Sequence, residues 1–386
     1  MKVILTIAGL SPEFGGPSRS VPALAEALSR ENVDVELLAC ESQPGYSAPV
    51  QPDVALVRTK FLPARSRERR WRAKWNDFFP ALCEHARATD SVVHDNGLWL
   101  PTNHAVLSAA RYLKRPLVIS PRGMLSEWAS THHGWKKKIA WTLFQRRDLH
   151  SASALHATSG QEMEDARRAG FRGPVALLPN GIELPELSKA SRAARSNRVA
   201  LCIARLHRVK GLMNLVDAWA EVRPGGWRML IAGSDEDGHR AELESAIAAR
   251  RLNSSFQFVG AVEGERKREL YRDADLFISP SFSENFGIGI AEALANALPV
   301  ITTQGTPWRD LIDHHCGWWE EIGVAPLAQA LREATALSDD ARCEMGQRGR
   351  ELVARKYSWS RVASEMRSVY EWLLGQENQP SCVNLS

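Results

Sequence analysis

Short runs of β-branched and apolar residues alternate along this chain with longer amphipathic runs, and this alternation constrains the fold more than any other feature. The first two runs, KVILTI and DVELLA, flank a glycine loop and the segment RSVPALAEALSR, whose apolar residues recur at helical spacing. Further runs follow at VALVRT, SVVHDN, PLVISP, SALHATS and PVALLPN. Alternating strand and helix patterns predict an α/β fold with a doubly wound parallel sheet.

A polar stretch divides this pattern into two halves. The alternation weakens from Glu183 to Arg198 and restarts with VALCIARL, WRMLIAGS, FQFVG, DLFISPS and PVITT. Because 386 residues are too many for one compact core, we predict two Rossmann-like domains, residues 1–183 and 184–359, joined by a linker at Glu183 to Arg198. A last helix is expected over residues 360–376, followed by a frayed tail.

Charge and cysteine content indicate which ligands and which cellular compartment suit the protein. A net charge of +4 fits an anionic ligand or membrane surface without requiring nucleic acid. The six cysteines form no C-x-x-C pair, which favours a reducing, cytoplasmic compartment. MKVILTIAGL is interpreted as a buried first strand rather than a signal peptide, because a glycine loop follows it instead of a small-residue cleavage site.

Gly15 and Gly16 follow the first strand and precede a helix whose first turn contains Ser18 and Arg19. Free amides at a helix N-terminus attract anions, so this glycine loop is a candidate ligand site. A plain turn before a helix explains the same residues. The order G-G-P-S is not the dinucleotide fingerprint G-x-G-x-x-G, which disfavours a Rossmann dehydrogenase.

Two cations follow the first strand of the second half. Arg205 and Lys210, in ARLHRVKG, precede a helix that begins near Gly211. Guanidinium and ammonium groups at this place would neutralise charge on a diphosphate leaving group. A solvated charged loop is the alternative.

Two carboxylates lie in SFSENFGIGIAEALANALPV. Glu284 falls in a loop after a buried strand, and Glu292 falls roughly one turn into the next helix. Between them, Gly287 and Gly289 let a ligand approach the backbone closely. Carboxylates accept hydrogen bonds from diols, so the pair fits a sugar nucleotide, with its diphosphate between the two. By itself, Glu292 is better explained as an exposed helix residue.

Together these motifs resemble the retaining glycosyltransferases of glycosyltransferase family 4, which have the GT-B fold. The matching segments span nearly the whole chain: Gly15-Gly16, ARLHRVKG, the strand end IAGS at Gly233, FVG, YRDADLFISPSFSENFG, the pair Glu284/Glu292, PVITT and KYSWSRVASEM. The resemblance is stronger in the second domain than in the first. It implies two Rossmann-like domains facing a central cleft, with the last helix packed back on the first domain.

The resemblance also implies roles for particular residues. It assigns Arg205 and Lys210 to the diphosphate, Glu292 to the ribose, and Glu284 to the donor sugar. The backbone amides after Glu284 and the strand end nearby complete the expected donor site: Asn285, Phe286, Gly287 and Gly233. These enzymes transfer a sugar from a UDP- or GDP-linked donor with retention of configuration, and a front-face mechanism fits a chain without an obvious nucleophile.

The first domain departs from the family pattern at one position. The family commonly has a histidine after a strand, in a segment like P-x-V-x-x-x-H-G, whereas this chain has PLVISPRGML with Arg122. An arginine is always charged and cannot act as a general base, so Arg122 is expected to bind an anionic group of donor or acceptor. His94, His132 and His133 are alternative participants, or polar loop residues.

Competing chemistries fit less well. D-x-D occurs at Asp235–Asp237 and Asp273–Asp275, but two cations already offset the diphosphate, so we expect no metal and no cofactor. Retaining glycosidases need two carboxylates about 5 Å apart and a general acid, which a diphosphate leaving group does not need. A GT-B sugar-nucleotide epimerase, a transferase with a small soluble acceptor, and a lectin-like scaffold remain as alternatives.

The expected acceptor is a glycan or polyprenyl-linked molecule of surface polysaccharide synthesis, either exopolysaccharide or lipopolysaccharide. Thr306-Pro307-Trp308, after PVITT, resembles enzymes of that kind and is expected to face the donor. Basic and aromatic residues interleave in ARSRERRWRAKWNDFF and HHGWKKKIAWTLFQRRD. Such segments suit an anionic bilayer, so we expect peripheral membrane binding; a charged helix face over core tryptophans is the alternative.

Overall fold

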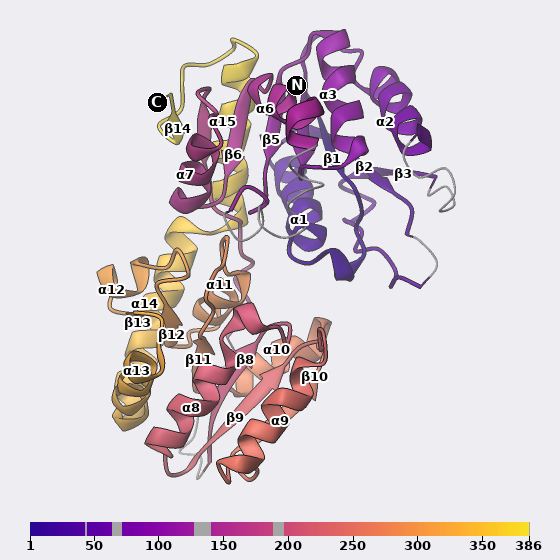
Figure 1. Cartoon of the computed structure of the whole chain (residues 1–386). Coiled ribbons are helices and arrows are strands. Elements are labelled where there is room, and N and C mark those ends of the chain that lie inside the picture. Colours follow the sequence, from indigo (N-terminus) through magenta and orange to yellow (C-terminus); the bar gives the residue numbers. More distant parts are fainter. Residues whose placement is uncertain (43–44, 64–71, 127–139, 188–196, 386) are drawn as a thin grey trace. The chain divides into compact units, whose positions relative to one another are not determined.

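A computed structural model of the chain describes residues 1–42, 45–63, 72–126, 140–187 and 197–385 (Figure 1). The chain forms two compact units: unit 1 combines Met1–Gly181 with Trp359–Ser386, and unit 2 is Ile182–Ser358. The sequence placed the two divisions at 183/184 and 359/360, within two residues of these bounds. Of the predicted linker, residues 188–196 lie outside the described part, and Arg198 already begins a strand.

Unit 1 is built on a sheet with strand order β14-β7-β6-β5-β4-β1-β2-β3. Its neighbouring strands are parallel except β14, which runs antiparallel to β7. The strands are β1 (Lys2–Ile7), β2 (Asp34–Cys40), β3 (Arg58–Leu62), β4 (Ser91–Asn96), β5 (Leu117–Ser120), β6 (Ala154–Ala157), β7 (Val175–Leu177) and β14 (Val383–Asn384). Between them lie η1 (Pro12–Phe14), α1 (Pro17–Arg30), α2 (Arg72–His85), α3 (Pro101–Leu113), η3 (Trp141–Gln145), α6 (Arg146–His150) and α7 (Gly160–Arg168).

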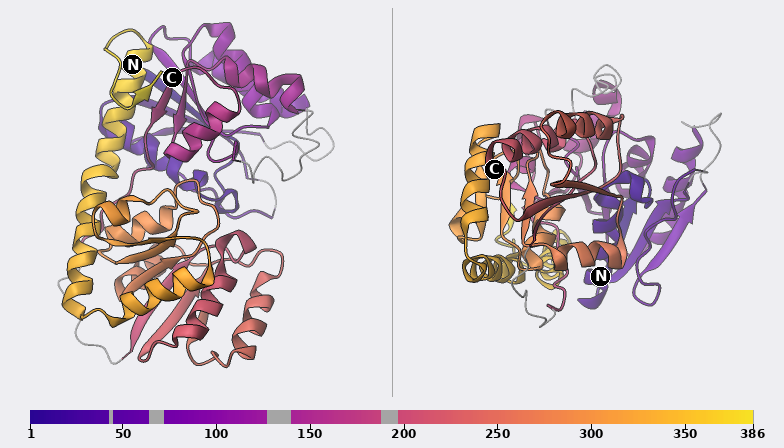
Figure 2. Two further views of the ribbon diagram at one scale, coloured as in Figure 1. Left: turned by 60° about the vertical axis from the view of Figure 1, so that its left-hand side comes forward. Right: turned by 90° about the horizontal axis from the view of Figure 1, so that it is seen from below.

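Helices cover both faces of this sheet, because successive side chains of a strand point to opposite faces. In β1, Val3 and Leu5 join a core with α1 and the last helix, α15 (Trp359–Leu373). Ile4, between them, joins a second core with α2 and α3. The yellow helix α15 therefore packs on unit 1, through buried residues such as Met366 and Tyr370 (Figures 1 and 2).

Two predictions for unit 1 were wrong. VALVRT is not a strand from its first residue: Asp53 accepts the amide of Ala55 on its side chain and those of Leu56 and Val57 on its carbonyl, and this turn delays β3 to Arg58. The tail does not fray either. Val383 is buried and pairs with β7 as part of β14, and Leu177 donates its amide to the Cys382 carbonyl.

Unit 2 contains a parallel sheet of order β10-β9-β8-β11-β12-β13. Its strands are β8 (Arg198–Ile203), β9 (Trp227–Ala232), β10 (Phe256–Gly260), β11 (Leu276–Ser279), β12 (Val300–Thr303) and β13 (Gly317–Glu320). The helices are η4 (Arg208–Lys210), α8 (Leu212–Val222), α9 (His239–Ala249), α10 (Gly264–Asp273), α11 (Ile288–Ala295), α12 (Asp310–Asp313), α13 (Val324–Ala336) and α14 (Asp339–Lys356).

This second sheet is also buried on both faces. Leu201 of β8 joins a core with α10, α11 and α14, whereas Cys202 joins one with α8, α9 and α13. Each unit is thus a doubly wound α/β layer structure, as the sequence predicted. Among the described residues, no helix combines the length and apolar character needed to cross a bilayer.

Candidate functional site

The predicted site residues of unit 2 lie in loops that follow its strands. Arg205 and η4 follow β8, Glu284 follows β11, and Gly305 lies in the turn after β12. Because these strands are parallel, their carboxyl ends meet at one edge of the sheet, which is where open α/β sheets bind ligands.

Glycines bring these loops into direct backbone contact. A Cβ on Gly211 would lie 2.0 Å from the Pro280 carbonyl oxygen, and one on Gly305 would lie 2.4 Å from that of Phe282. The amide of Phe282 donates to Val209 at 2.8 Å, and the amide of Glu284 donates to Gly305 at 2.9 Å. No larger residue fits either glycine position without moving the loops that carry Lys210 and Glu284.

Lys210 and Glu284 meet as a result. The ammonium Nζ lies 2.6 Å from Glu284 Oε1, and Ser281 Oγ donates to the same oxygen at 2.9 Å. The two charged side chains are 12 % and 19 % exposed, so the pair is largely enclosed but still reachable by a ligand. The structure therefore joins the cation predicted for a diphosphate to the carboxylate predicted for a sugar.

Arg205 does not join this pair. Its Nη1 donates to both carboxylate oxygens of Glu236, at 2.6 and 2.8 Å, and its side chain is 53 % exposed. Gly233, at the end of β9, allows the approach that positions Arg205, because a Cβ there would lie 1.8 Å from the Ala204 carbonyl oxygen. Glu236 belongs to the D-E-D segment, and no sequence pattern indicates that it pairs with Arg205.

The start of α11 combines a left-handed glycine with a buried aromatic anchor. Gly287 has φ 79° and is the N-cap residue of α11. The Phe286 side chain is 5 % exposed, its ring lies 5.5 Å from that of Trp308, and Trp308 Nε1 donates to the Phe286 carbonyl at 2.6 Å. Phe286 can thus contribute only backbone to a ligand, and Asn285, half-buried, immediately precedes it.

The burial of Trp308 contradicts the prediction that the segment Thr306-Pro307-Trp308 faces the donor. Trp308 is only 1 % exposed and Thr306 only 2 %, so the T-P-W segment does not present these side chains to a ligand. The indole instead packs between Phe286 and Tyr357, with ring centroids 5.5 and 5.0 Å away. Its apolar bulk and single N–H explain this placement, since burial of a tryptophan requires one acceptor.

Glu292 has its own partners on α10. Lys267 Nζ lies 2.6 Å from Oε1, and the Tyr271 hydroxyl donates to Oε2 at 2.8 Å. Glu292 is 27 % exposed, and each carboxylate oxygen retains a second lone-pair direction for a ligand. Burial of the Tyr271 hydroxyl, and secondly the negative charge of Glu292, hold the pKa of Tyr271 well above its ordinary value. Sequence reasoning missed Lys267 and Tyr271, although their spacing of four places both on one helix face.

The glycine loop of unit 1 is a tight helix start. Gly15 has φ 78°, and the Ser18 hydroxyl donates to its carbonyl at 2.7 Å. The amides of Ser18 and Arg19 donate to the carbonyls of Gly15 and Gly16, so these two amides are used within the turn itself. A ligand role for Gly15 and Gly16 remains a prediction.

Arg122 follows β5 and is half-buried in unit 1. Its Nε and Nη2 donate to Asn96 Oδ1 at 3.1 and 2.8 Å, and Nη1 donates to Asn180 Oδ1 at 2.9 Å. Burial lowers the pKa of the guanidinium to about 10, partly offset by Glu162. Arg122 is therefore held by neutral oxygens and stays charged at neutral pH.

Two buried histidines form a chain of hydrogen bonds across the same sheet. His156 Nε2 donates to the Leu178 carbonyl at 2.9 Å, so its Nδ1 accepts from Ser120 Oγ at 2.8 Å. His94 Nε2 then donates to Ser120 at 2.7 Å, and its Nδ1 accepts from the Tyr370 hydroxyl at 2.6 Å. This direction requires two neutral imidazoles. Burial lowers the pKa of His94 well below its usual range and that of His156 to about 3.

His94 is consequently a structural residue that ties α15 to β4, rather than an exposed base. His132, His133 and most of the basic and aromatic residues predicted to meet a membrane lie outside the described residues or in the undescribed side chains of α2. Arg146, Arg147 and Trp141 are described, and both arginines are exposed.

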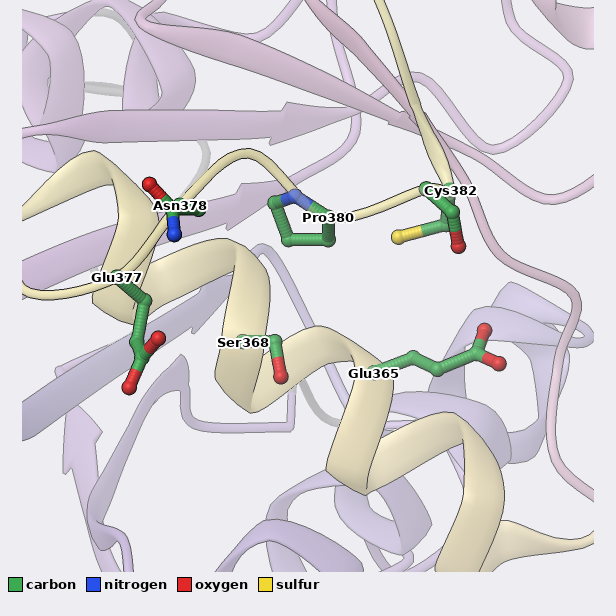
Figure 3. A pocket seen from close by; sticks show the side chains of 7 residues that line it. Glu365, Ser368, Glu377, Asn378, Pro380 and Cys382 are labelled. Atoms are coloured by element: carbon green, nitrogen blue, oxygen red, sulfur yellow. The ribbon is translucent and has the colours of Figure 1, made fainter.

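A hollow of ≈ 290 Å³ lies between α15 and the C-terminal tail (Figure 3). Figure 3 shows Glu365 and Ser368 on the helix below Pro380 and Cys382. None of the predicted site residues lines it: the lining is Glu365, Ser368, Glu377, Asn378, Pro380, Ser381 and Cys382. Within the described ranges, no group of three His, Cys, Asp or Glu side chains is placed to hold a metal ion.

Comparison with known proteins matches both units. The family model described as "Glycosyl transferase 4-like domain" matches residues 15–181, and "Glycosyl transferases group 1" matches residues 185–352. The phosphatidyl-myo-inositol mannosyltransferase of Mycobacterium leprae is 27 % identical, covering 92 % of this chain and 93 % of its own. The GDP-mannose:cellobiosyl-diphosphopolyprenol alpha-mannosyltransferase of Xanthomonas oryzae pv. oryzae is 24 % identical, covering 97 % and 98 %.

Among solved structures, sucrose-phosphate synthase of Thermosynechococcus elongatus superimposes with a TM-score of 0.80 at 20 % identity, covering 98 % of this chain and 100 % of its own. At that identity the likeness shows the fold alone. The two family models together account for most of the length of both units. The chain is therefore a glycosyltransferase that belongs to the family 4-like enzymes of the GT-B fold.

Proposed function

We propose that the enzyme transfers a hexose from a nucleoside-diphosphate sugar, UDP- or GDP-linked, to a glycan or polyprenyl-linked acceptor in surface polysaccharide synthesis. The observation that carries this proposal is the Lys210–Glu284 pair, 2.6 Å long, at the carboxyl edge of the unit 2 sheet. One side chain offers a cation for the diphosphate, and the other offers an acceptor for sugar hydroxyls. Glu292, which is 27 % exposed and keeps acceptor capacity on both oxygens, would hold the ribose.

Charge on the leaving diphosphate would be offset by Lys210 and, once released from Glu236, by Arg205. Two such cations supply the electrostatic stabilisation that a leaving phosphate needs. We therefore propose transfer without a metal or cofactor, and retention of configuration by a front-face path. Glu284 and Arg122 are the proposed catalytic residues, and Asn285, Phe286 and Gly287 would contribute backbone amides to the donor sugar.

The names of two relatives support the proposed acceptor class. One matching enzyme is named for a phosphatidyl-myo-inositol acceptor and another for a diphosphopolyprenol acceptor. Both acceptors are lipids that carry phosphate. A transferase acting on a small soluble acceptor would keep the same donor site, and it remains the alternative for the acceptor alone.

The donor site is tested by binding. Glu292→Gln is expected to weaken binding of the preferred UDP- or GDP-sugar by roughly ten- to a hundredfold, because hydrogen bonds to a charged group contribute about 1.5–3 kcal/mol. Titration calorimetry with a panel of both donor classes measures this and identifies the base. Glu244→Gln is the control, since Glu244 is exposed on α9 and pairs only with Arg240 among the described ion pairs.

A donor lacking the ribose 2′-hydroxyl sharpens the test. If Glu292 holds the ribose, the deoxy donor and the Glu292→Gln change will each weaken binding, and together they will weaken it by less than the product of their effects. Fully multiplicative effects, or a variant that binds as tightly as the unaltered enzyme, would remove Glu292 from the site.

Peripheral binding to an anionic bilayer is the second part of the proposal. Leu143 is 74 % exposed and Leu100 43 %, and the two segments that carry them are joined because Trp99 donates its amide to Gln145 at 2.7 Å. Arg146 and Arg147 are exposed just beyond. Exposed leucines beside arginines are typical of surfaces that enter the headgroup region.

Leu143→Asp is expected to weaken binding to phosphatidylglycerol-containing vesicles by at least about tenfold, because burying a leucine is worth roughly 1.5–3 kcal/mol. Vesicle co-sedimentation at low salt measures the effect. Ile322→Asp is a matched control, because Ile322 is 48 % exposed in unit 2. Absence of binding by the unaltered protein at low salt would defeat the membrane hypothesis without touching the donor site.

A further inference from the structure

Arg122 is a half-buried cation whose described partners are all neutral. Its three hydrogen bonds go to the amide oxygens of Asn96 and Asn180. Asn96 and Asn180 are themselves 4 % and 8 % exposed. Among the described residues, no carboxylate forms an ion pair with this guanidinium. A cation removed from water is costly unless an anion compensates it.

Glu162, the carboxylate whose charge acts on the pKa of Arg122, accepts hydrogen bonds from other residues. Glu162 Oε1 accepts the amide of Gly123 at 2.6 Å, and Oε2 accepts the amide and hydroxyl of Thr158 at 2.7 and 2.9 Å. Glu162 therefore acts on Arg122 through its charge, and no ion pair between the two is present among the described contacts. The two imidazoles nearby are neutral, and Arg122 contributes to lowering the pKa of both.

Residues at the ends of three strands hold the guanidinium at the carboxyl edge of the unit 1 sheet. Asn96 ends β4, Arg122 follows β5 and Asn180 follows β7, so all three sit at carboxyl ends of parallel strands. Arg122 also has φ 55°, a left-handed conformation that costs free energy in a side chain with a Cβ. Of the five N–H donors of a guanidinium, three are used by the asparagines, which leaves two for a ligand.

We propose that Arg122, aligned by Asn96 and Asn180, binds a phosphoryl group of a substrate, and that the asparagines are positioning residues which hold the guanidinium without neutralising it. The identity of that substrate rests on the proposed function, because the phosphoryl group belongs either to the nucleotide donor or to a lipid diphosphate acceptor. A carboxylate in place of the Asn180 amide would satisfy the geometry equally well but would compete with the phosphoryl group. At Asn96 it would also face the Thr6 and His94 carbonyls, to which the Asn96 amide now donates. Neutral amides avoid that competition.

Asn180→Asp is the most discriminating change. Asn180 has no described hydrogen bond other than the one from Arg122, so the aspartate replaces one acceptor by another of the same shape. Binding of a phosphoryl ligand is expected to weaken at least tenfold, while the urea midpoint stays the same or rises because an ion pair has been added. Arg122→Gln is expected to weaken binding at least as much, and Arg122→Lys to restore part of it. Arg111→Gln, which removes an exposed charge from α3, is the control.

Three kinds of probe identify the source of the phosphoryl group by titration calorimetry on the full chain. They are the nucleotides UDP and GDP, farnesyl diphosphate below its micelle concentration, and inorganic pyrophosphate. Loss of nucleotide binding in both variants assigns Arg122 to the donor, and loss of farnesyl diphosphate binding assigns it to the acceptor. Unchanged binding of all three probes in Arg122→Gln overturns the proposal, and unchanged binding in Asn180→Asp overturns the role of the asparagines. Failure of the proposed function looks different, because the unaltered enzyme would then bind no sugar nucleotide, whereas its Arg122-dependent binding of pyrophosphate would still be measurable.

Discussion

Replacing Glu284 by alanine is expected to lower kcat/KM for sugar transfer by at least about a hundredfold, close to 3 kcal/mol of transition-state stabilisation. Two losses combine in this variant. The donor sugar loses its carboxylate acceptor, and Lys210 loses the partner 2.6 Å away that fixes its ammonium group. Ser281, which donates to the same oxygen, is also left without its acceptor.

Steady-state kinetics with the preferred donor measures the effect, and circular dichroism checks the fold. Glu284→Gln separates the two losses, since the amide keeps an acceptor oxygen but not the charge that pairs with Lys210. Glu244→Ala, on the exposed face of α9, should behave as the unaltered enzyme. Near-normal turnover in Glu284→Ala would show that the Lys210–Glu284 pair is a structural ion pair and not the donor site.

Acid is expected to destabilise unit 1 through His94 and His156. Both have folded-state pKa values below the ordinary 6.5, that of His156 at about 3. Below pH 6.5 the unfolded chain binds protons that the folded chain does not, and for His156 this difference persists down to about pH 3. Stability is therefore present above pH 6.5 and falls as the pH drops. The loss is on the order of 1 kcal/mol per pH unit for each histidine.

Two other ionisable groups close to these histidines also affect how stability depends on pH. Burial raises the pKa of Asp95 from 3.8 to about 6, so Asp95 alone would make the protein more stable as the pH falls through that window. Arg122 stays charged and opposes protonation of both imidazoles. The Asp95 contribution is common to the unaltered protein and a histidine variant, and it therefore cancels in their comparison.

Urea unfolding of the unaltered protein and of His156→Gln at pH 7.5 and pH 5 tests this account. The variant is expected to be less stable at pH 7.5, because Ser120 and Leu178 lose their partner, but to lose less stability on acidification. Tyr370→Phe, which removes only the hydroxyl bonded to His94, is a control that should keep the dependence on pH from His156. Equal pH dependence in the unaltered protein and His156→Gln would mean that the His156 imidazole is charged in the folded state at pH 5, which would contradict this account.

The sequence predicted the elements whose signal is local. SVVHDN and FQFVG became β4 and β10 at the predicted residues, and the alternation of patterns identified two doubly wound units. Lys210 and Glu284 were both named in advance because each follows a strand. Parallel strands place their carboxyl ends at one edge, so that part of the site is a consequence of topology.

The side-chain pairings that the sequence did not predict join residues far apart along the chain. Arg205 pairs with Glu236, Glu292 with Lys267, and Arg122 with Asn180, and none of these pairings has a periodic signal. Trp308 was expected beside the ligand but is buried against Phe286. The acceptor that allows this burial is a carbonyl of another loop, and the sequence around Trp308 does not reveal it. The tail looked frayed because β14 has only two residues, and their pairing with β7 stabilises them.

The most direct test of the central claim is an NMR time course of the preferred sugar nucleotide with enzyme and EDTA, first without and then with a polyprenyl diphosphate-linked acceptor. The proposed function predicts that the donor persists alone, and that with acceptor its anomeric signal is replaced by a glycoside of the same configuration. A new sugar nucleotide formed without acceptor would instead show an epimerase, and free sugar would show a hydrolase. An inverted glycoside, or no reaction until a divalent metal is restored, would contradict the retaining, metal-independent mechanism.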